Sequence, residues 1–248
     1  CIGGDHGFGG AIALCAEAAH RVGAGLISAA TRAEHVSMLL TRRPECMARA
    51  VDDVDALQPL LDRASVVAIG PGLGNSAWSA AMLHAALDTP KPRVLDADAL
   101  NALARRDALA LGDAVLTPHP GEAARLLGCD VAEVERDRLV AARQLAARYG
   151  CVVVLKGAGT VVAAPDEIAV LIDAGNPGMA SGGMGDVLTG VIAGVIAQGL
   201  RPFDAAVCGT LLHAAAGDAA ARDGGERGLL ASDLFPYLRR LANPTPHA

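Results

Sequence analysis

The amino-acid sequence predicts a single α/β domain over residues 1–248, folded as a three-layer α/β/α sandwich around a mostly parallel central sheet. Short segments rich in Val, Ile and Leu alternate with segments whose apolar residues have helical spacing, which is the order of βαβ units. No charge block, Ser/Gly tract, repeat or low-complexity run marks a linker. The chain is 52% hydrophobic but only 2% aromatic, and small aliphatic side chains suit helices packed closely on a sheet.

The first half of the chain has the pattern of strand, turn and helix in repeated units. A Gly-rich turn at residues 3–10 leads into a segment with helical apolar spacing. Short apolar runs then indicate strands, and the segments between several of them indicate helices. The predicted strands cover residues 25–30, 46–51, 65–69, 93–95 and 114–116, and the predicted helices cover residues 11–22, 34–40, 55–63 and 76–87.

The second half begins with a long amphipathic helix, predicted over residues 135–149. The β-branched run 151–155 predicts a buried strand. Pro165 and Asp166 indicate a turn between two strands of a hairpin-type pair, at 161–164 and 167–172. Three helices are predicted to close the chain at residues 186–198, 203–222 and 232–241, the last with Ser232 as its N-cap.

Polar residues directly follow several of the predicted strands. Asp96–Asn101 comes after one strand, Thr117–Glu122 after the next and Lys156–Thr160 after a third. Open parallel sheets bind their ligands at the carboxyl ends of the strands. We therefore expect the site at this edge of the sheet.

Composition and charge exclude several classes of partner. The formal net charge is −6, which argues against a nucleic-acid groove lined with cations. The most apolar run, 187–200, contains glycines and a glutamine and is too short to span a bilayer. Six scattered cysteines without metal-ligand spacing indicate a reduced cytoplasmic protein with small buried thiols. Because the sequence starts at Cys1 without an initiator Met, we expect it to be a piece of a longer chain.

The segment Asp173–Gly190, D-A-G-N-P-G-M-A-S-G-G-M-G-D-V-L-T-G, carries the strongest signal for a site. Its glycines let the backbone turn sharply and aim successive amides at one point, where a helix begins. Unpaired amides and the helix dipole suit a phosphate, yet Asp186 places a carboxylate there. The residues alone leave two interpretations open: a dipole partner or cap, or a general base beside a phosphate cradle.

Other polar residues also have a structural and a functional interpretation. Lys156 is either a solvated lysine before a tight turn or a cation close to a nucleotide. His119, held between two prolines, is more often a capping or surface residue than a catalyst. Glu122 is either a first-turn dipole partner or an outer-shell carboxylate for Mg²⁺. His213, on an apolar helix face, indicates a satisfied core histidine.

Familiar catalytic motifs are missing, but one motif indicates a different function, the binding of a redox dinucleotide. Neither lysine follows a glycine as a Walker A loop requires, and Ser181 lies outside a G-x-S-x-G elbow. The segment Gly72–Ala77 follows a strand, opens a helix and precedes Asp96 and Asp98, which matches a relaxed dinucleotide fingerprint. Taken alone it is a weak sign of an NAD(P)-dependent dehydrogenase, because small residues in such turns often serve packing only.

Four segments spread over nearly the whole chain form a far more specific combination: Gly3–Gly7, Thr117–Gly128, Lys156–Thr160 and Ala174–Gly190. Together they resemble the ADP-dependent NAD(P)H-hydrate dehydratase family of the ribokinase-like superfamily. The G-x-G-D element of that superfamily resembles Gly183–Asp186. The resemblance implies a ribokinase-like fold.

The resemblance also implies a repair reaction. NADH and NADPH that have been hydrated across a ring double bond, in their S form, are dehydrated again at the expense of ADP or ATP, with Mg²⁺. The implied nucleotide contacts are Lys156, Gly157, Ala158, Gly159, Thr160 and Gly185, and the implied contacts to the hydrated dinucleotide are Ala11, Gly74, His119 and Asp186. In the superfamily's T-P-N-x-x-E element His119 stands where Asn is expected while Glu122 is kept, which implies Glu122 for Mg²⁺. A homo-oligomer and a fused upstream epimerase domain are implied as well.

A mechanism follows from the chemistry of such a substrate. A ring hydroxyl is a poor leaving group, so Asp186 takes its proton while the oxygen attacks the terminal phosphate of ADP or ATP. The amides of residues 182–185, with Mg²⁺, stabilise the charge on the phosphoryl group, and the ring nitrogen then expels phosphate. Two alternatives stay open: a ribokinase-like small-molecule kinase that releases a stable phosphorylated product, and a nucleotide-sensing module without turnover, against which Asp186 argues.

Overall fold

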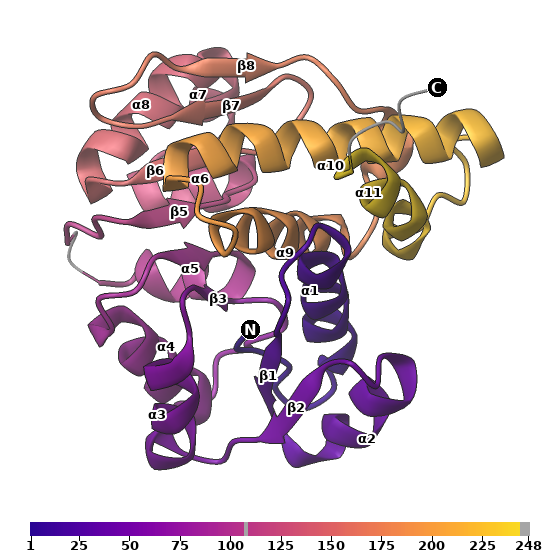
Figure 1. The fold of residues 1–248 in the computed structure, drawn as a ribbon. Helices are drawn as coiled ribbons and strands as arrows, with labels where there is room; N and C mark the ends of the chain where they lie inside the picture. Colours follow the sequence, from indigo (N-terminus) through magenta and orange to yellow (C-terminus); the bar gives the residue numbers. More distant parts are fainter. Residues whose placement is uncertain (107–108, 244–248) are drawn as a thin grey trace.

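The computed structural model describes residues 1–106 and 109–243, which form one sheet with helices on both faces (Figure 1). The strands are β1 (Ser28–Thr31), β2 (Met47–Ala50), β3 (Val67–Ile69), β4 (Arg93–Leu95), β5 (Ala114–Leu116), β6 (Val152–Leu155), β7 (Thr160–Ala163) and β8 (Val170–Ile172). The helices are α1 (Gly9–Arg21), α2 (Ala33–Arg42), α3 (Val54–Arg63), α4 (Ala77–Asp88), α5 (Ala97–Leu103), α6 (Pro120–Leu127), α7 (Val131–Arg136), α8 (Arg138–Tyr149), α9 (Met184–Ile196), α10 (Pro202–Gly224) and α11 (Phe235–Leu241), with 3₁₀ turns at Pro177–Met179 and Ala231–Leu234.

The sheet is mostly parallel, as predicted. β1 pairs with β2, and β3 to β6 pair in chain order, all in parallel. Ile2 bridges Ala30 and Ile69 in parallel and so joins the two groups of strands. β7 and β8 are antiparallel additions, because the short connections between β6, β7 and β8 allow a strand to turn back, whereas parallel neighbours need a crossover.

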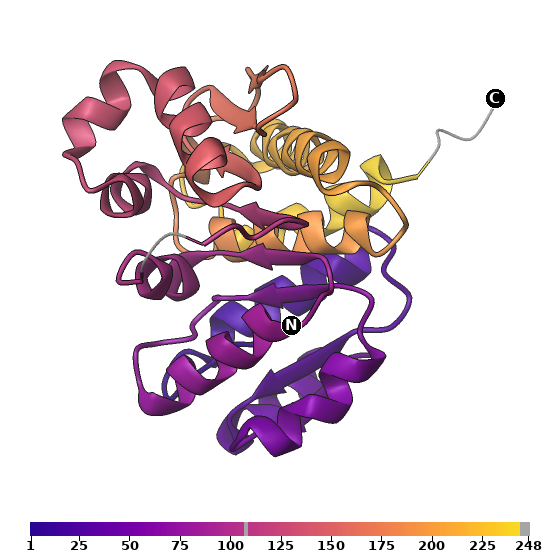
Figure 2. The same cartoon turned by 90° about the vertical axis from the view of Figure 1, so that its left-hand side faces the viewer.

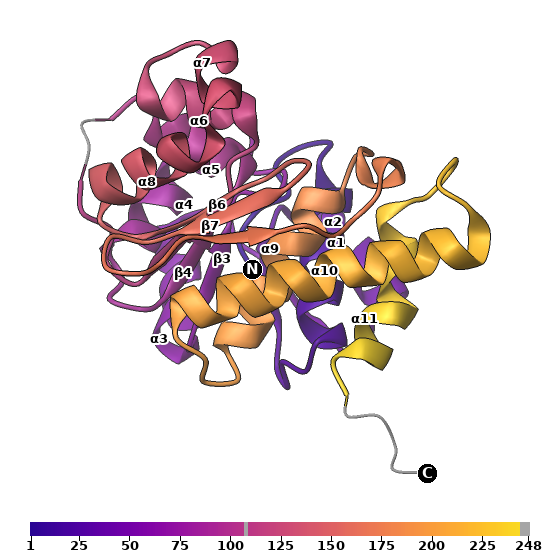
Figure 3. The same ribbon diagram turned by 90° about the horizontal axis from the view of Figure 1, so that it is seen from above.

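Strands β3 to β6 bury both faces against helices, which gives three layers (Figures 2 and 3). Alternate residues of β3 to β6 enter two different cores. Ile69, Leu95 and Leu116 join the core under α3 to α8, whereas their neighbours Ala68 and Val94 join the core under α1, α9, α10 and α11. The near-continuous apolar runs of the strands are therefore explained by burial on both sides.

Two local predictions are wrong. The helix expected over 135–149 is two helices, because Asp137 has a non-helical backbone (φ −148°, ψ 86°) and its carboxylate accepts a hydrogen bond from the Val140 amide at 2.9 Å, capping α8. Ser232 is not an N-cap: it lies inside a 3₁₀ turn, α11 begins at Phe235, and Asp233 accepts from the Leu230 amide at 2.9 Å instead.

The cysteine prediction is only partly confirmed. All six thiols are free, but only Cys15, Cys46 and Cys151 are buried, and Cys208 is exposed. No helix among the described residues is both long enough and apolar enough to cross a membrane.

Glycines in α9 let α1 approach it closely. A Cβ on Gly190 would lie 2.1 Å from the Cys15 carbonyl oxygen, and one on Gly194 would lie 2.8 Å from the Ala19 carbonyl oxygen. Near the start of α9, a Cβ on Gly183 would lie 2.6 Å from Leu14 of α1. The first turn of α9 and the first turns of α1 therefore share one end of the molecule, where the candidate site lies.

Gly190→Ala is expected to destabilise the protein by about 1–3 kcal/mol, because the added methyl group forces two packed backbones apart. Urea unfolding measures the change. Gly224→Ala is the matched control, since a Cβ at Gly224 meets nothing within 4 Å. Equal unfolding midpoints for the two variants would contradict the close approach.

Candidate active site

A buried ion pair lies where β4 and β6 end. The Lys156 ammonium donates to Asp96 Oδ1 at 2.7 Å, and the Thr189 hydroxyl donates to Asp96 Oδ2 at 2.9 Å. Asp96 is 1% exposed. Burial acts to raise the pKa of Asp96, but the Lys156 charge and these hydrogen bonds outweigh burial and hold it below its ordinary value. In the same way, Asp96 and Glu122 overcome the effect of burial and raise the pKa of Lys156.

Asp186 stands in the first turn of α9, beside this pair. Burial raises its pKa to about 7, the charges of Asp96 and Asp98 add to the increase, and Lys156 opposes it. The N-cap of α9 is Gly183, at φ 90°, and the Asp186 carboxylate accepts no hydrogen bond from the part of the chain that the structure describes. Asp186 is therefore not a helix cap, and its pKa suits a base that works near neutral pH.

Gly185 keeps the space beside the ion pair open. A Cβ at Gly185 would lie 3.2 Å from Lys156 Nζ and 3.3 Å from Asp96 Oδ2. The first amides of α9 have no partner within the helix, as at any helix N-terminus, and Gly185 lies among them. Lys156 and Gly185, two of the predicted nucleotide contacts, are thus brought together by the fold.

The loop from Lys156 to Thr160 is tied to the neighbouring strand end. The Lys156 amide donates to the Pro118 carbonyl at 2.8 Å. Gly157 and Gly159 have φ values of 144° and 69°, which side chains rarely allow. The Thr160 hydroxyl closes the loop by donating to the Gly157 carbonyl at 3.0 Å.

His119 and Glu122 cap α6 reciprocally. His119 Nδ1 accepts from the Gly121 amide at 2.9 Å, and Glu122 Oε2 accepts from the His119 amide at 2.8 Å. The capping interpretation of His119 is confirmed, and its ring is about half exposed, with 51% of the side chain accessible. Glu122 is buried and lies 3.7 Å from Lys156 Nζ. Within the described residues, no group of three or more His, Cys, Asp or Glu side chains is placed to hold a metal ion.

The N-terminal Gly-rich turn and the Gly72–Gly74 turn pack against each other. A Cβ on Gly72 would meet Phe8 at 2.7 Å and Ala11 at 3.1 Å. The Gly74 amide donates to Asp98 Oδ2 at 2.8 Å. Ala11, in the first turn of α1, therefore packs against the turn that contains Gly74. Both residues are predicted to contact the dinucleotide. Asp98 thus binds a backbone amide of this turn, and Asp96 binds Lys156.

Sequence reasoning missed Asp96 as the partner of Lys156. A lysine that ends a fully buried strand needs a carboxylate nearby, and that signal was available. Ala97, the next residue, has φ 48° and is the only non-glycine residue of the described chain with positive φ, which indicates a constrained backbone at this point. His213 is a core residue as predicted: it is buried, and burial lowers its pKa to about 4. Its ring is not fully satisfied, because Nε2 has no hydrogen-bond partner among the described residues.

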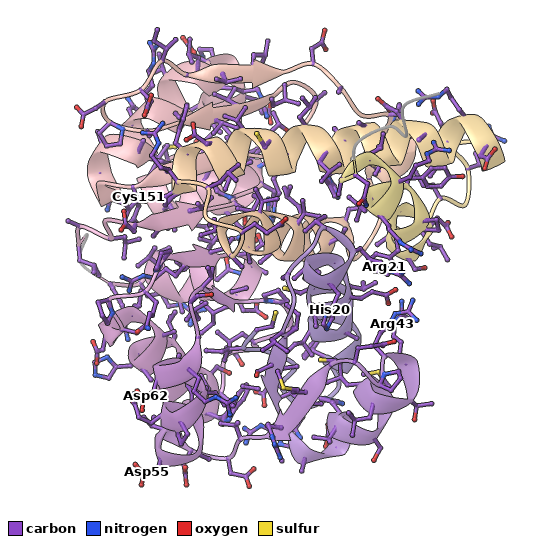
Figure 4. All side chains as sticks on the ribbon, in the orientation of Figure 1. His20, Arg21, Arg43, Asp55, Asp62 and Cys151 are labelled. Carbon is purple, nitrogen blue, oxygen red and sulfur yellow. The ribbon has the colours of Figure 1, made fainter. Side chains whose placement is uncertain are left out.

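A second polar cluster lies at the other end of α1 (Figure 4). The buried Glu17 carboxylate pairs with Arg21 at 3.4 Å, with Arg42 at 3.0 Å and with Arg43. Arg21 and Arg42 occupy the last turns of α1 and α2, where cations offset the helix dipole. This cluster, in which one carboxylate faces three guanidinium groups, is separate from the candidate site.

Comparison with known proteins gives the family. A family model described as NAD(P)H-hydrate dehydratase matches residues 1–240. The bifunctional NAD(P)H-hydrate repair enzyme Nnr of Coxiella burnetii is 54% identical over 243 residues, which are 98% of this chain and 50% of that protein. The chain thus spans about half the length of this relative.

Two solved structures share the fold. The ADP/ATP-dependent NAD(P)H-hydrate dehydratase from Bacillus subtilis, co-crystallised with ATP and Mg²⁺ and soaked with CoA, is 30% identical with a TM-score of 0.86 over 97% of this chain and 88% of that chain. A ribokinase-like superfamily protein from Enterococcus faecalis is 30% identical with a TM-score of 0.89 over 97% and 84% of the two chains. The predicted three-layer, ribokinase-like fold is confirmed, and the chain belongs to the NAD(P)H-hydrate dehydratase family.

Proposed function

We propose that this chain dehydrates the S forms of NADH hydrate and NADPH hydrate to NADH and NADPH, with ADP or ATP as phosphoryl donor. The observation that carries the proposal is the Asp186 carboxylate, with its pKa near 7, in a helix turn that also offers unpaired amides beside the Lys156–Asp96 pair. A base and a phosphate site in one turn suit a reaction in which a hydroxyl receives a phosphoryl group. The names of the relatives from Coxiella burnetii and Bacillus subtilis support the same activity.

Asp186 is the proposed catalytic residue. It accepts the proton of the ring hydroxyl as that oxygen attacks the terminal phosphorus of the nucleotide, so the O–P bond forms as the bond to the rest of the nucleotide breaks. The ring hydroxyl thereby becomes a phosphate, which the electron pair of the ring nitrogen can expel to leave an iminium ion. Loss of a proton from the adjacent ring carbon to solvent then restores the ring double bond. NADH or NADPH, inorganic phosphate and the shortened nucleotide leave the site.

The nucleotide is proposed to bind over the loop from Lys156 to Thr160, including Gly157, Ala158 and Gly159, with its phosphates facing Gly185. Lys156 and the amides at the start of α9 offset the charge of the transferred phosphoryl group. The dinucleotide is proposed to bind on the Ala11 and Gly74 side. His119 faces solvent with its ring and is proposed to contact the dinucleotide there.

Mg²⁺ is proposed to arrive with the nucleotide. Mg²⁺ is usually held by one or two carboxylates together with substrate phosphates, so a site without a cluster of three protein ligands fits it. Glu122 is the carboxylate proposed to hold it. Bound there, Mg²⁺ would neutralise charge on the phosphates.

Residues 1–248 are proposed to act as one dehydratase domain, with a fused epimerase domain upstream. The support is the Coxiella burnetii relative, which is bifunctional and of which this chain covers 50%. The other two expectations from the sequence are a homo-oligomer and a cytoplasmic location, and six free thiols suit the second. Sedimentation of the full-length protein tests the homo-oligomer, and its intact mass tests the upstream domain.

One assay tests the function. The protein is incubated with NADH hydrate, ADP or ATP, and MgCl₂, and the absorbance of regenerated NADH is followed. Regeneration that requires a nucleotide and releases phosphate is the expected result. A stable phosphorylated product without NADH would favour the small-molecule kinase, and nucleotide binding without any product would favour a sensing module.

The rate is expected to depend on pH through Asp186. A base must be unprotonated, so kcat/KM should fall tenfold for each pH unit below about 7, where the Asp186 carboxyl becomes protonated. Initial rates between pH 5.5 and 8.5 at low substrate, with saturating nucleotide, measure this. A profile that stays flat down to about pH 5 would contradict a base with this pKa.

A further inference from the structure

Arg138, the first residue of α8, holds the loop that follows β6. Its Nη2 donates to the carbonyl oxygens of Leu155 and Lys156, at 3.1 Å each, and more weakly to that of Gly159, at 3.5 Å. Its Nη1 donates to Glu135 at 3.0 Å. The side chain is only 16% exposed. One guanidinium therefore fixes both ends of the loop.

The same contacts fix the direction of the amides in this loop. In a trans peptide the N–H points away from the C=O of the same peptide unit. The Leu155–Lys156 unit shows this, because its carbonyl accepts from Arg138 while its amide donates to the Pro118 carbonyl at 2.8 Å on the other side. In the next peptide unit, Lys156–Gly157, the Lys156 carbonyl also accepts from Arg138. The Gly157 amide of that unit therefore points away from Arg138. That amide has no partner within the described part of the chain.

Gly157 is shaped to receive the guanidinium. A Cβ at this residue would lie 2.8 Å from Nη2, 2.9 Å from Nη1 and 3.1 Å from Cζ of Arg138. The φ value of 144° is also one that only glycine adopts readily. Arg138 and Gly157 thus form one unit in which the arginine occupies the place of the missing side chain.

We propose that Arg138 is a positioning residue that sets the affinity for the nucleotide by aiming the amides of the Lys156–Thr160 loop. This rests on the proposed function, in which that loop binds ADP or ATP. Arg138 donates through Nη1 to Glu135 and through Nη2 to the loop carbonyls, whereas its buried Nε has no partner among the described residues. The contacts that Arg138 makes to the loop are therefore made by Nη2, and it acts through them. A planar guanidinium can bridge several carbonyls at fixed angles, whereas a lysine ammonium lacks that rigid fork.

The test compares Arg138→Met and Arg138→Lys with the wild type. The Kd of ADP with MgCl₂ is measured by calorimetry, and KM is measured for ADP and for NADH hydrate separately. Hydrogen exchange of the peptide covering residues 155–160, without nucleotide, reports the order of the loop. Arg148→Met is the matched control, because Arg148 also lies on α8 and donates to a backbone carbonyl, that of Leu127 at 3.2 Å.

In Arg138→Met, the Kd and KM for ADP are expected to rise at least about tenfold, as for the loss of charge-assisted hydrogen bonds. The KM for NADH hydrate should stay within about twofold, the loop should exchange faster, and Arg148→Met should match the wild type. ADP binding by Arg138→Met within about twofold of wild type would overturn the role of Arg138. If Arg138→Met does not fold, Arg138→Lys is measured instead. A rise in the Kd of ADP of at least about tenfold would then support the role of Arg138, and a Kd within about twofold of wild type would overturn it. A wild type that binds no ADP would refute the proposed function itself.

Discussion

Asp186→Asn is expected to lower turnover at least about 100-fold, since a positioned general base contributes about that much or more. The amide has nearly the shape of the carboxylate but cannot accept the proton of the ring hydroxyl. Because the nucleotide is proposed to bind through the Lys156–Thr160 loop and the α9 amides, the Kd of ADP should not weaken. Single-turnover rates and calorimetry measure the two quantities. Turnover near that of the wild type would remove the catalytic role.

The same variant should be more stable than the wild type above pH 7. The pKa of Asp186 is raised from 3.8 to about 7 in the folded protein, so folding favours the protonated form. The stability from this group is fully present below pH 3.8 and is lost as the pH rises towards 7. Asparagine has no such loss. Thermal unfolding should therefore show a Tm gain for Asp186→Asn at pH 8 and almost none at pH 4.

Asp204→Asn separates this behaviour from that of an ordinary dipole partner. Asp204 is also an acid in the first turn of a helix, α10, but its side chain is 44% exposed and pairs with Arg201 at 2.8 Å. Its replacement should lower stability slightly, by less than about 1 kcal/mol, and leave turnover unchanged. A loss of stability at pH 8 in Asp186→Asn, like that expected in Asp204→Asn, would support the dipole interpretation of Asp186.

The sheet and the edge that carries the site were predictable from sequence because parallel strands have a simple signature. Buried runs such as Val152–Leu155 are apolar on both faces, and the polar residues that follow them must gather at one edge. The start of α9 was predictable for a similar reason, since the glycines before Asp186 permit a turn that few other sequences allow. These features depend on residues close together in the chain.

The remaining features depend on contacts between distant residues or on one competing hydrogen bond. The Lys156–Asp96 pair joins residues 60 positions apart, and periodicity carries no information on such pairing. The break at Asp137 interrupts a pattern that suits one long helix, because the Asp137 carboxylate captures the Val140 amide. That break also makes Arg138 the first residue of a new helix, so its contact with the loop after β6 was equally hidden.

Asp96→Asn is expected to destabilise the protein by about 3–5 kcal/mol, because it leaves the Lys156 ammonium buried without its main partner. Lys156 is 20% exposed at its side chain and retains Glu122 at 3.7 Å, which favours the lower end of this range. Thr189→Val removes only the hydrogen bond to Asp96 Oδ2 and keeps both charges, so it should cost about 1 kcal/mol. Urea unfolding at pH 7.5 measures all of these variants.

The double variant Asp96→Asn with Lys156→Met decides whether charge or packing is responsible. With both charges removed no uncompensated ion stays buried, so this variant should be more stable than Asp96→Asn alone. The pH profile gives a second, independent answer. The charge of Asp96 raises the pKa of Asp186, and the charge of Lys156 opposes this increase. The activity left in Asp96→Asn should therefore persist to lower pH than in the wild type. Thr189→Val keeps both charges, so the acidic limb of its pH–rate profile should stay near pH 7. An unshifted limb in Asp96→Asn, or a double variant less stable than the single one, would show that Asp96 does not act on Asp186 and Lys156 through its charge.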